Sequence, residues 1–185
     1  ALAECLRCGL LCNDSLLVEE EGRFHVQGDP TEGALYASAA KAGLLAQQVN
    51  LLWPRRDTIP FESQHQYMAT LHTAPGGGLV IYAKGALETI LVRCTSALST
   101  AGQPISFDPV EIQSAVAAMA AQGLRVLAVA RRELMEDKQD LSHADIATGM
   151  TFLGLQGMID PPRAEAMQAV RNCHSAGIGV KMITG

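Results

Sequence analysis

Hydrophobic and polar residues alternate along this chain in short runs, and their spacing changes several times between helical and extended. Apolar residues that recur every three or four positions predict helices, which cover residues 2–12, 30–41, 84–92, 109–122 and 164–176. Short apolar runs between turn signals predict strands, which cover residues 15–18, 24–26, 55–61, 67–72, 79–83, 124–130, 151–159 and 179–183. Residues 135–147 are the least regular stretch, with Ser142 as the candidate cap of a helix.

The order of these elements indicates two different arrangements. Up to residue 159, closely spaced strands and polar turns are typical of antiparallel hairpins. We therefore predict an α+β fold there, a twisted antiparallel sheet flanked by helices. The tail instead has the order strand, helix, strand of a right-handed crossover in a parallel sheet. Because Pro161 and Pro162 interrupt it, we place a domain boundary between the segments 1–159 and 160–185.

Two of the predicted helices start with the same capping signal. Asp29 precedes Pro30, and Glu32 stands three residues after the cap, where a capping box has its acidic residue. Asp108 and Glu111 repeat this arrangement around the next proline. We therefore expect both helices to begin at these prolines.

Composition and charge exclude several classes of protein. Of the 185 residues, 48% are hydrophobic and 18% charged, which is typical of a globular chain and not of a disordered one. Nineteen acidic residues against fourteen basic ones give a net charge of −5, which argues against binding to nucleic acid. The longest apolar stretches, such as residues 79–83, are far shorter than the ~20 residues of a membrane-spanning helix. We expect this chain by itself to be monomeric.

The five cysteines do not form a metal-binding pattern. Cys5, Cys8 and Cys12 would share one face of the first helix, but a zinc site needs a fourth ligand, and no second motif supplies one. We interpret them as small buried residues in a reducing compartment. The five histidines are scattered, and we expect surface or capped residues rather than ligands.

Three segments carry candidate chemistry, and each has an ordinary explanation as well. Residues 28–33 (GDPTEG) form a helix start that either binds a ligand or is simply capped. Residues 84–86 (KGA) place a cation after an apolar strand, either at a ligand or in solvent. Arg125 lies in an otherwise apolar strand, where a buried guanidinium needs an anion, either a protein carboxylate or a phosphate.

Six segments in order resemble the cytoplasmic nucleotide-binding domain of the P-type cation-transporting ATPases, more like the type II pumps than the heavy-metal branch. They are residues 28–35 (GDPTEGAL), 60–68 (PFESQHQYM), 82–86 (YAKGA), 124–128 (LRVLA), 157–163 (GMIDPPR) and 182–185 (MITG). The resemblance spans essentially the whole chain.

The resemblance implies that the domain binds ATP, accompanied by Mg²⁺ in the whole protein. It implies that Phe61 stacks on adenine and that Glu32, with Thr31 beside it, recognises the adenine amino group. Lys84 would supply charge near the nucleotide, and Arg125 would meet the phosphates. The remaining residues assigned to the site by the motifs are Ser63, Gln66, Gly85 and Ala86.

One departure from the family pattern lies inside this site. Gln66 stands where the family has a lysine, so a cation is missing beside the nucleotide. A charge-assisted hydrogen bond is about twice as strong as a neutral one, and we therefore expect weaker ATP binding. The neighbouring His65 can replace that charge only when it is protonated.

A second departure concerns catalysis. The family phosphorylates the aspartate of a D-K-T-G-T motif, and this sequence has no such motif. By resemblance, Thr184 and Gly185 would lie near the transferred phosphoryl group, and residues 160–163 would belong to a hinge. We expect a piece of an integral membrane protein, on its cytoplasmic side, that binds ATP without turning it over. Its partners would be the phosphorylation, actuator and transmembrane domains of the same chain.

Two other interpretations stay open at this point. The chain could come from a soluble phosphohydrolase of the haloacid-dehalogenase kind, suggested by the strand ending at Gly185, although the nucleophilic aspartate of that family is missing before this strand. It could also be a binding module that uses the same fold without a nucleotide.

Overall fold

The computed structural model describes residues 1–20, 23–134, 138–160 and 162–183. The α-helices are α1 (Leu2–Leu11), α2 (Pro30–Lys41), α3 (Ala46–Leu52), α4 (Leu87–Leu91), α5 (Pro109–Ala120) and α6 (Ala164–Ser175), with one 3₁₀-helix, η1 (His143–Ile146). The strands are β1 (Leu16–Glu20), β2 (Arg23–Gln27), β3 (Arg55–Glu62), β4 (Tyr67–Thr73), β5 (Leu79–Gly85), β6 (Cys94–Leu98), β7 (Pro104–Ile105), β8 (Arg125–Leu134) and β9 (Met150–Met158). None of the described helices is both long and apolar enough to span a membrane.

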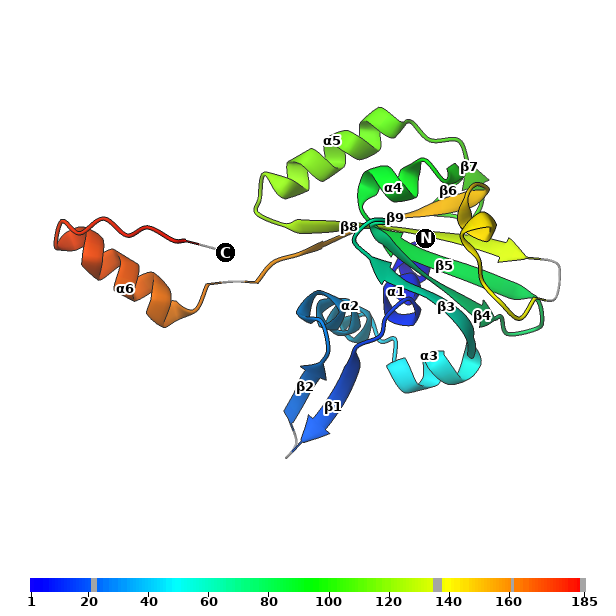
Figure 1. Ribbon diagram of the computed structural model, residues 1–185, viewed down its shortest axis with the longest axis horizontal. Coiled ribbons are helices and arrows are strands. Elements are labelled where there is room, and N and C mark those ends of the chain that lie inside the picture. Colours follow the sequence, from blue (N-terminus) through cyan, green and yellow to red (C-terminus); the bar gives the residue numbers. More distant parts are fainter. Residues whose placement is uncertain (21–22, 135–137, 161, 184–185) are drawn as a thin grey trace.

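Within the described ranges, the strands form one large sheet and one small one. The large sheet has the order β3-β4-β5-β8-β9-β6-β7, and β1 pairs only with β2 in a hairpin that projects from the body (Figure 1). Neighbouring strands are antiparallel except β6 and β9, which run parallel. The predicted α+β fold is therefore confirmed, with a mixed sheet in place of a purely antiparallel one.

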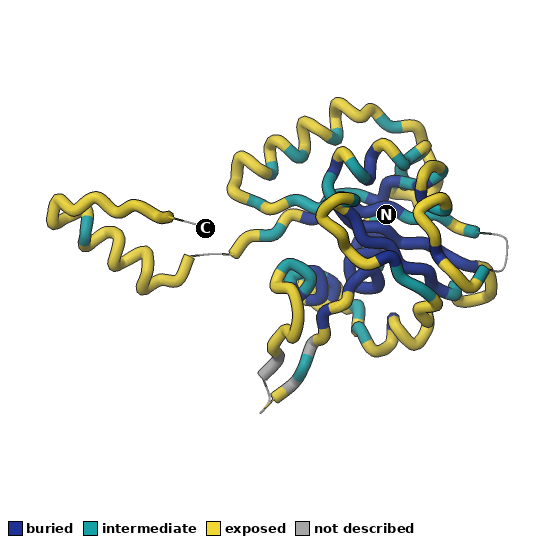
Figure 2. The backbone as a smooth tube through the Cα atoms, in the orientation of Figure 1, coloured by how far each residue is buried: buried dark blue, intermediate teal, exposed yellow. Residues whose placement is uncertain are grey.

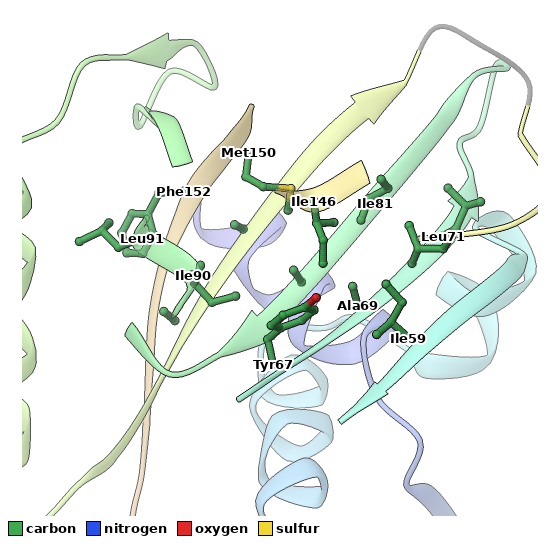
Figure 3. Packing of buried hydrophobic residues seen from close by; sticks show 14 of the residues in the cluster. Ile59, Tyr67, Ala69, Leu71, Ile81, Ile90, Leu91, Ile146, Met150 and Phe152 are labelled. Carbon is green, nitrogen blue, oxygen red and sulfur yellow. The ribbon is translucent and has the colours of Figure 1, made fainter. Parts of the chain in front are cut away.

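The large sheet buries different residues on its two faces because successive side chains of a strand point to opposite sides. On one face, Tyr67, Ala69 and Leu71 of β4 lie on the same side as Ile90 of α4 and Ile146 of η1 (Figure 3). On the other face, residues of β4, β5 and β8 pack against α1, α2 and α3. The sheet is thus a buried layer between two groups of helices, as the burial colours show (Figure 2).

The cysteines of α1 belong to the core, as predicted. Cys5, Cys8 and Cys12 are buried and free. The Cys8 thiol donates to the carbonyl oxygen of Ala83 at 3.5 Å, and the Cys12 thiol to that of Met68 at 3.4 Å. Burial raises the pKa of Cys5 to about 11. Burial also raises the pKa of Cys8 and of Cys12. The thiols of Cys8 and Cys12 therefore link the first helix to β5 and β4, and none of the three thiols is ionised near neutral pH.

Several predicted boundaries were wrong. The helix placed at 84–92 begins only at Leu87, because residues 84 and 85 still belong to β5. The pattern also missed α3 and the short strands β6 and β7. The last predicted strand, 179–183, is not formed. A strand needs a neighbour for its backbone hydrogen bonds, and the segment after α6 lies exposed and apart from the sheet (Figures 1 and 2).

The capping predictions are confirmed in part. The side chain of Asp29 accepts a hydrogen bond from the backbone of Thr31, and Asp108 caps α5 in the same way through Val110. Ser142 caps η1 in a complete capping box. Glu32, however, does not close a box on Asp29, because its carboxylate points to other donors described below.

His72 contradicts the expectation of surface histidines. Its side chain is 1% exposed, and its Nδ1 atom lies 2.9 Å from the carbonyl oxygen of Trp53. Burial, partly offset by this carbonyl, lowers the pKa of His72 from 6.5 to about 4. His72 is therefore neutral in the folded state at pH values where the unfolded chain protonates it.

This difference makes stability depend on pH. The unfolded state binds more protons below pH 6.5, so the free energy of unfolding decreases as the pH falls from 6.5 towards 4. Between pH 7 and pH 5, His72 contributes a loss of about 2 kcal/mol. Urea denaturation at both pH values should show this loss, and His72→Phe should remove it. An equal loss in the variant would contradict the prediction.

Candidate functional site

The turn between β3 and β4 presents the aromatic candidate residue. Phe61 stands near the end of β3 with 58% of its surface exposed, and Ser63 follows it in the exposed turn. The register of β3 against β4 shifts between Ile59 and Glu62, which is where the strand leaves its regular pairing. The backbone carbonyl of Glu62 accepts hydrogen bonds from the amides of His65 and Gln66 and closes the turn. Phe61 is thus held at a fixed place without being part of the core.

Lys84 is not solvated, because it forms a buried ion pair. Its residue is 6% exposed, and its Nζ atom lies 2.5 Å from Oε1 of Glu32 in the first turn of α2. Lys84 lies at the end of β5, opposite Met68 of β4 and Val129 of β8. The ion pair therefore brings segments 28–33 and 84–86 into contact, which the sequence analysis had identified only as separate candidates.

The second oxygen of the Glu32 carboxylate is also occupied. Oε2 accepts hydrogen bonds from the backbone amides of Asp14 and Ser15, both at 3.0 Å, and from Oγ of Ser15 at 3.2 Å. The backbone carbonyl of Glu32 accepts from Nδ2 of Asn13 at 2.9 Å. Residues 13–15 connect α1 to β1, so this connection contacts Glu32 closely. The sequence showed only a turn signal there.

Gly85 is required by the protein itself. A Cβ atom at this position would lie 2.4 Å from the carbonyl oxygen of Gln66 and 2.8 Å from Cβ of Tyr67. The same carbonyl accepts the backbone amide of Ala86 at 3.0 Å. Close backbone packing therefore explains this glycine without a ligand. Ala86 is half-buried and precedes α4, whereas Gln66 is exposed at the tip of the turn with a φ of 55°.

Arg125 does not have the environment that the sequence predicted. It is the exposed first residue of β8, so burial does not force an anion upon it. In the described part of the chain it forms no ion pair. Arg125 lies close enough to the start of α2 to act on Asp29. The pKa of Asp29 is lowered mainly by hydrogen bonds from Thr31, and the positive charge of Arg125 lowers it further. Arg125 is thus available to bind an anion from solvent.

Together these residues combine an exposed surface with buried groups at one end of the large sheet: Phe61, Ser63, Gln66 and Arg125 are exposed, whereas Lys84 and Gly85 are buried. Glu32, Lys84, Gly85, Ala86 and Gln66 come together at one end of β4 and β5. Thr31 adjoins Glu32, Phe61 lies near the end of β3 with Ser63 directly after the strand, and Arg125 is the first residue of β8. Thr184 and Gly185 lie outside the described residues.

The turn also contacts a segment that the sequence analysis did not connect with it. The hydroxyl of Tyr67 is hydrogen-bonded to Nδ1 of His143 in η1. The rings of His65 and His143 lie 4.5 Å apart between centroids, and the guanidinium of Arg93 lies 4.7 Å from the centroid of the Tyr67 ring. The polar spacing of residues 135–147 gave no signal for this contact.

Two cavities lie outside this surface. One, of about 460 Å³, is formed by residues of α1, α2 and β9, including Leu6, Leu35 and Leu155. The other, of about 300 Å³, is lined by residues that include Tyr36 and Arg55. Phe61, Lys84 and Arg125 line neither cavity.

Comparison with known proteins gives a consistent result. A family model described as "P-type ATPase, cytoplasmic domain N" matches residues 1–165. The chain is 56% identical over its whole length to "Cation-transporting ATPase pma1" of Synechocystis sp., and 42% identical to "Probable cation-transporting ATPase F" of Mycobacterium tuberculosis. It is 34% identical to "Calcium-transporting ATPase" of Bacillus subtilis. Each of these matches covers 100% of this chain but only 20% or 21% of the length of the relative.

The packing at Gly85 predicts a loss of stability that does not need a ligand. Gly85→Ala should lower the free energy of unfolding by about 1–3 kcal/mol, because the new methyl group overlaps the carbonyl of Gln66. Urea denaturation without nucleotide measures the effect. Gly179→Ala, where no atom lies within 4 Å of the added Cβ, is the matched control. Equal stability of both variants would contradict the packing argument.

Proposed function

Since this chain belongs to the P-type ATPases, whose cytoplasmic domain N its sequence matches over residues 1–165, we propose that its candidate site binds ATP. The observation that supports the proposal is that the exposed Phe61 and the Glu32–Lys84 pair lie at the same end of the sheet. The residues that follow them, Glu62 of β3 and Gly85 of β5, both pair with Tyr67 of β4. An aromatic platform and fixed polar groups are what a nucleotide base requires.

Phe61 supplies the stacking surface. The chain has four phenylalanines, and this one is exposed instead of contributing its ring to the core. Stacking of a base on an aromatic side chain contributes about 1–3 kcal/mol. The fixed turn that carries Phe61 lowers the entropy that would be lost on binding.

Glu32 supplies an acceptor for the base. Among the described residues its Oε1 atom has one donor, Lys84, and a carboxylate oxygen can accept two hydrogen bonds. The 6-amino group of adenine is a suitable second donor. Gly85 and Ala86 form the edge of the site next to Lys84.

The phosphates would be met by Arg125 and by the polar groups of the turn. Arg125 is exposed at the start of β8, and a guanidinium suits phosphate oxygens geometrically. Ser63 and Gln66 offer neutral hydrogen bonds. Among the described residues, no three His, Cys, Asp or Glu side chains gather to hold a metal ion. By the resemblance, Mg²⁺ would accompany ATP in the whole protein, with its ligands mostly outside this chain.

The whole protein would couple ATP hydrolysis to the transport of a cation across a membrane. This part of the proposal is supported by the names of the relatives, of which the chain spans about a fifth. The phosphorylated aspartate of the family would belong to another part of the protein, together with the phosphorylation, actuator and transmembrane domains. This chain alone would bind ATP and accept no phosphoryl group from it.

Replacement of Phe61 tests the proposal. Phe61→Ala should weaken ATP binding by about 1–3 kcal/mol in isothermal titration calorimetry, because the stacking surface is lost. The melting temperature should stay unchanged, since the ring lies outside the core. Ile105→Ala, which also removes an exposed apolar side chain but on β7, is the matched control and should bind ATP normally. Normal affinity in Phe61→Ala would refute the assignment.

Gln66→Lys should strengthen ATP binding, because it adds a cation next to the phosphates. A charge-assisted hydrogen bond is about twice as strong as a neutral one. The gain should decrease as salt is raised, since exposed charges are screened. Gln122→Lys adds the same charge two residues after the end of α5 and should leave the affinity unchanged. Equal affinities of the two variants at low salt would show that position 66 does not face the nucleotide.

A further inference from the structure

The hydroxyl group of Ser15 is buried directly beside the proposed ATP site. Ser15 is 1% exposed, and its Oγ atom lies 3.2 Å from Oε2 of Glu32 and 3.2 Å from the carbonyl oxygen of Asp29. A Cβ atom on Gly28 would lie 2.4 Å from the same Oγ. Gly28, with a φ of 131°, thus leaves the space that the hydroxyl occupies.

The hydrogen bonds of Glu32 are unequally divided between its two oxygens. Among the described residues, Oε2 meets three donors, two backbone amides and the Ser15 hydroxyl, whereas Oε1 meets Lys84 alone. The Ser15 hydroxyl shares its one hydrogen between Oε2 and the carbonyl oxygen of Asp29. A carboxylate oxygen carries two lone pairs, so Oε2 has no capacity left and Oε1 can accept one further bond. The direction of that open position depends on how the carboxylate is rotated.

We propose that Ser15 is a positioning residue that fixes this rotation and thereby makes the site prefer adenine to a 6-oxopurine. The inference rests on the proposed function and deepens it. Adenine presents a 6-amino donor to Oε1. Hypoxanthine and guanine present a carbonyl oxygen at the same place, which a carboxylate repels. Without the Ser15 hydroxyl, Oε2 keeps the two backbone amides but loses its side-chain donor. The carboxylate is then held less firmly, and the discrimination decreases.

Asn13 also holds Ser15 and Glu32 in place. It is 3% exposed, its Nδ2 atom donates to the carbonyl oxygens of Gly9 and Glu32, and its Oδ1 atom accepts the amide of Ser15 at 2.9 Å. The connection between α1 and β1 is thereby tied both to its own helix and to α2. Ser15 is thus held at both its backbone and its side chain.

The test compares the binding of ATP and of ITP, which differ in the 6-amino or 6-oxo group of the base and in the hydrogen that N1 carries only in the 6-oxopurine. Isothermal titration calorimetry on the 185-residue chain gives the ratio of the two dissociation constants. In Ser15→Ala this ratio should move towards one by about three- to tenfold, as expected for the loss of one hydrogen bond. Ser96→Ala removes a comparable hydroxyl contact, to Thr151 in the β6–β9 pair, and should keep the ratio. Ser15→Cys, which keeps the size with a weaker donor, should be intermediate.

A double-mutant cycle separates positioning from general destabilisation. In a Glu32→Gln background, Ser15→Ala should not change the ratio further, because its effect passes through Glu32. An unchanged ratio in Ser15→Ala, equal weakening of ATP and ITP, or no preference in the original chain would overturn the proposal while ATP binding itself stands.

A measurement without nucleotide distinguishes failure of this proposal from failure of the proposed function. If Ser15 holds Glu32 against Lys84, Ser15→Ala should increase acetylation of Lys84 by acetic anhydride, read by mass spectrometry against the exposed Lys41. Ser96→Ala should not. If the original chain binds neither nucleotide, the ATP site is refuted and the proposed preference for adenine falls with it. The labelling then still decides whether Ser15 positions Glu32: equal labelling of Lys84 in the two variants would refute that as well.

Discussion

The buried ion pair between Lys84 and Glu32 is the constraint on which this end of the molecule depends. An ammonium group that is taken out of water needs a close anion, and removing one partner of such a pair costs about 3–5 kcal/mol. The pair fixes the first turn of α2 to the last residues of β5. Through Asp14 and Ser15, the same carboxylate also fixes the connection from α1 to β1. Three parts of the chain, far apart in sequence, are thereby held in one place.

The direction of Lys84 follows from the alternation of side chains along β5. Val80 and Tyr82 point to the face that α1, α2 and α3 cover, and Lys84 continues this series by two residues. Ile81 and Ala83 belong to the core on the opposite face. A shift of one residue in the pairing of β5 would turn Lys84 away from Glu32 and bury it without a partner. The ion pair therefore also specifies the register of the sheet.

Local patterns predicted the elements well and the environments of charged residues poorly. The Asp29 cap needs only its neighbour Thr31, so the sequence alone revealed it. Lys84 and Glu32 are separated by 52 positions, and nothing near either residue shows which charge it meets. Arg125 was expected to be buried because its strand is apolar, yet β8 extends beyond β5 there and leaves it exposed. Burial at the end of a strand depends on how far the neighbouring strands extend. The hydrophobic periodicity of a single strand does not give this information.

The distribution of charge suggests which part of a nucleotide this site would read most strictly. Residues 62–66 of the turn include no Lys or Arg, and the charge of Lys84 is already neutralised by Glu32. Among the described residues assigned to the proposed site, Arg125 would then be the permanent cation that faces the phosphates. Exposed ionic contacts contribute little in salt solution, whereas hydrogen bonds from buried, fixed groups penalise a mismatched base strongly. On the proposed function, selectivity would therefore come from the base end of the site. The orientation of the Glu32 carboxylate would then matter more than the number of positive charges.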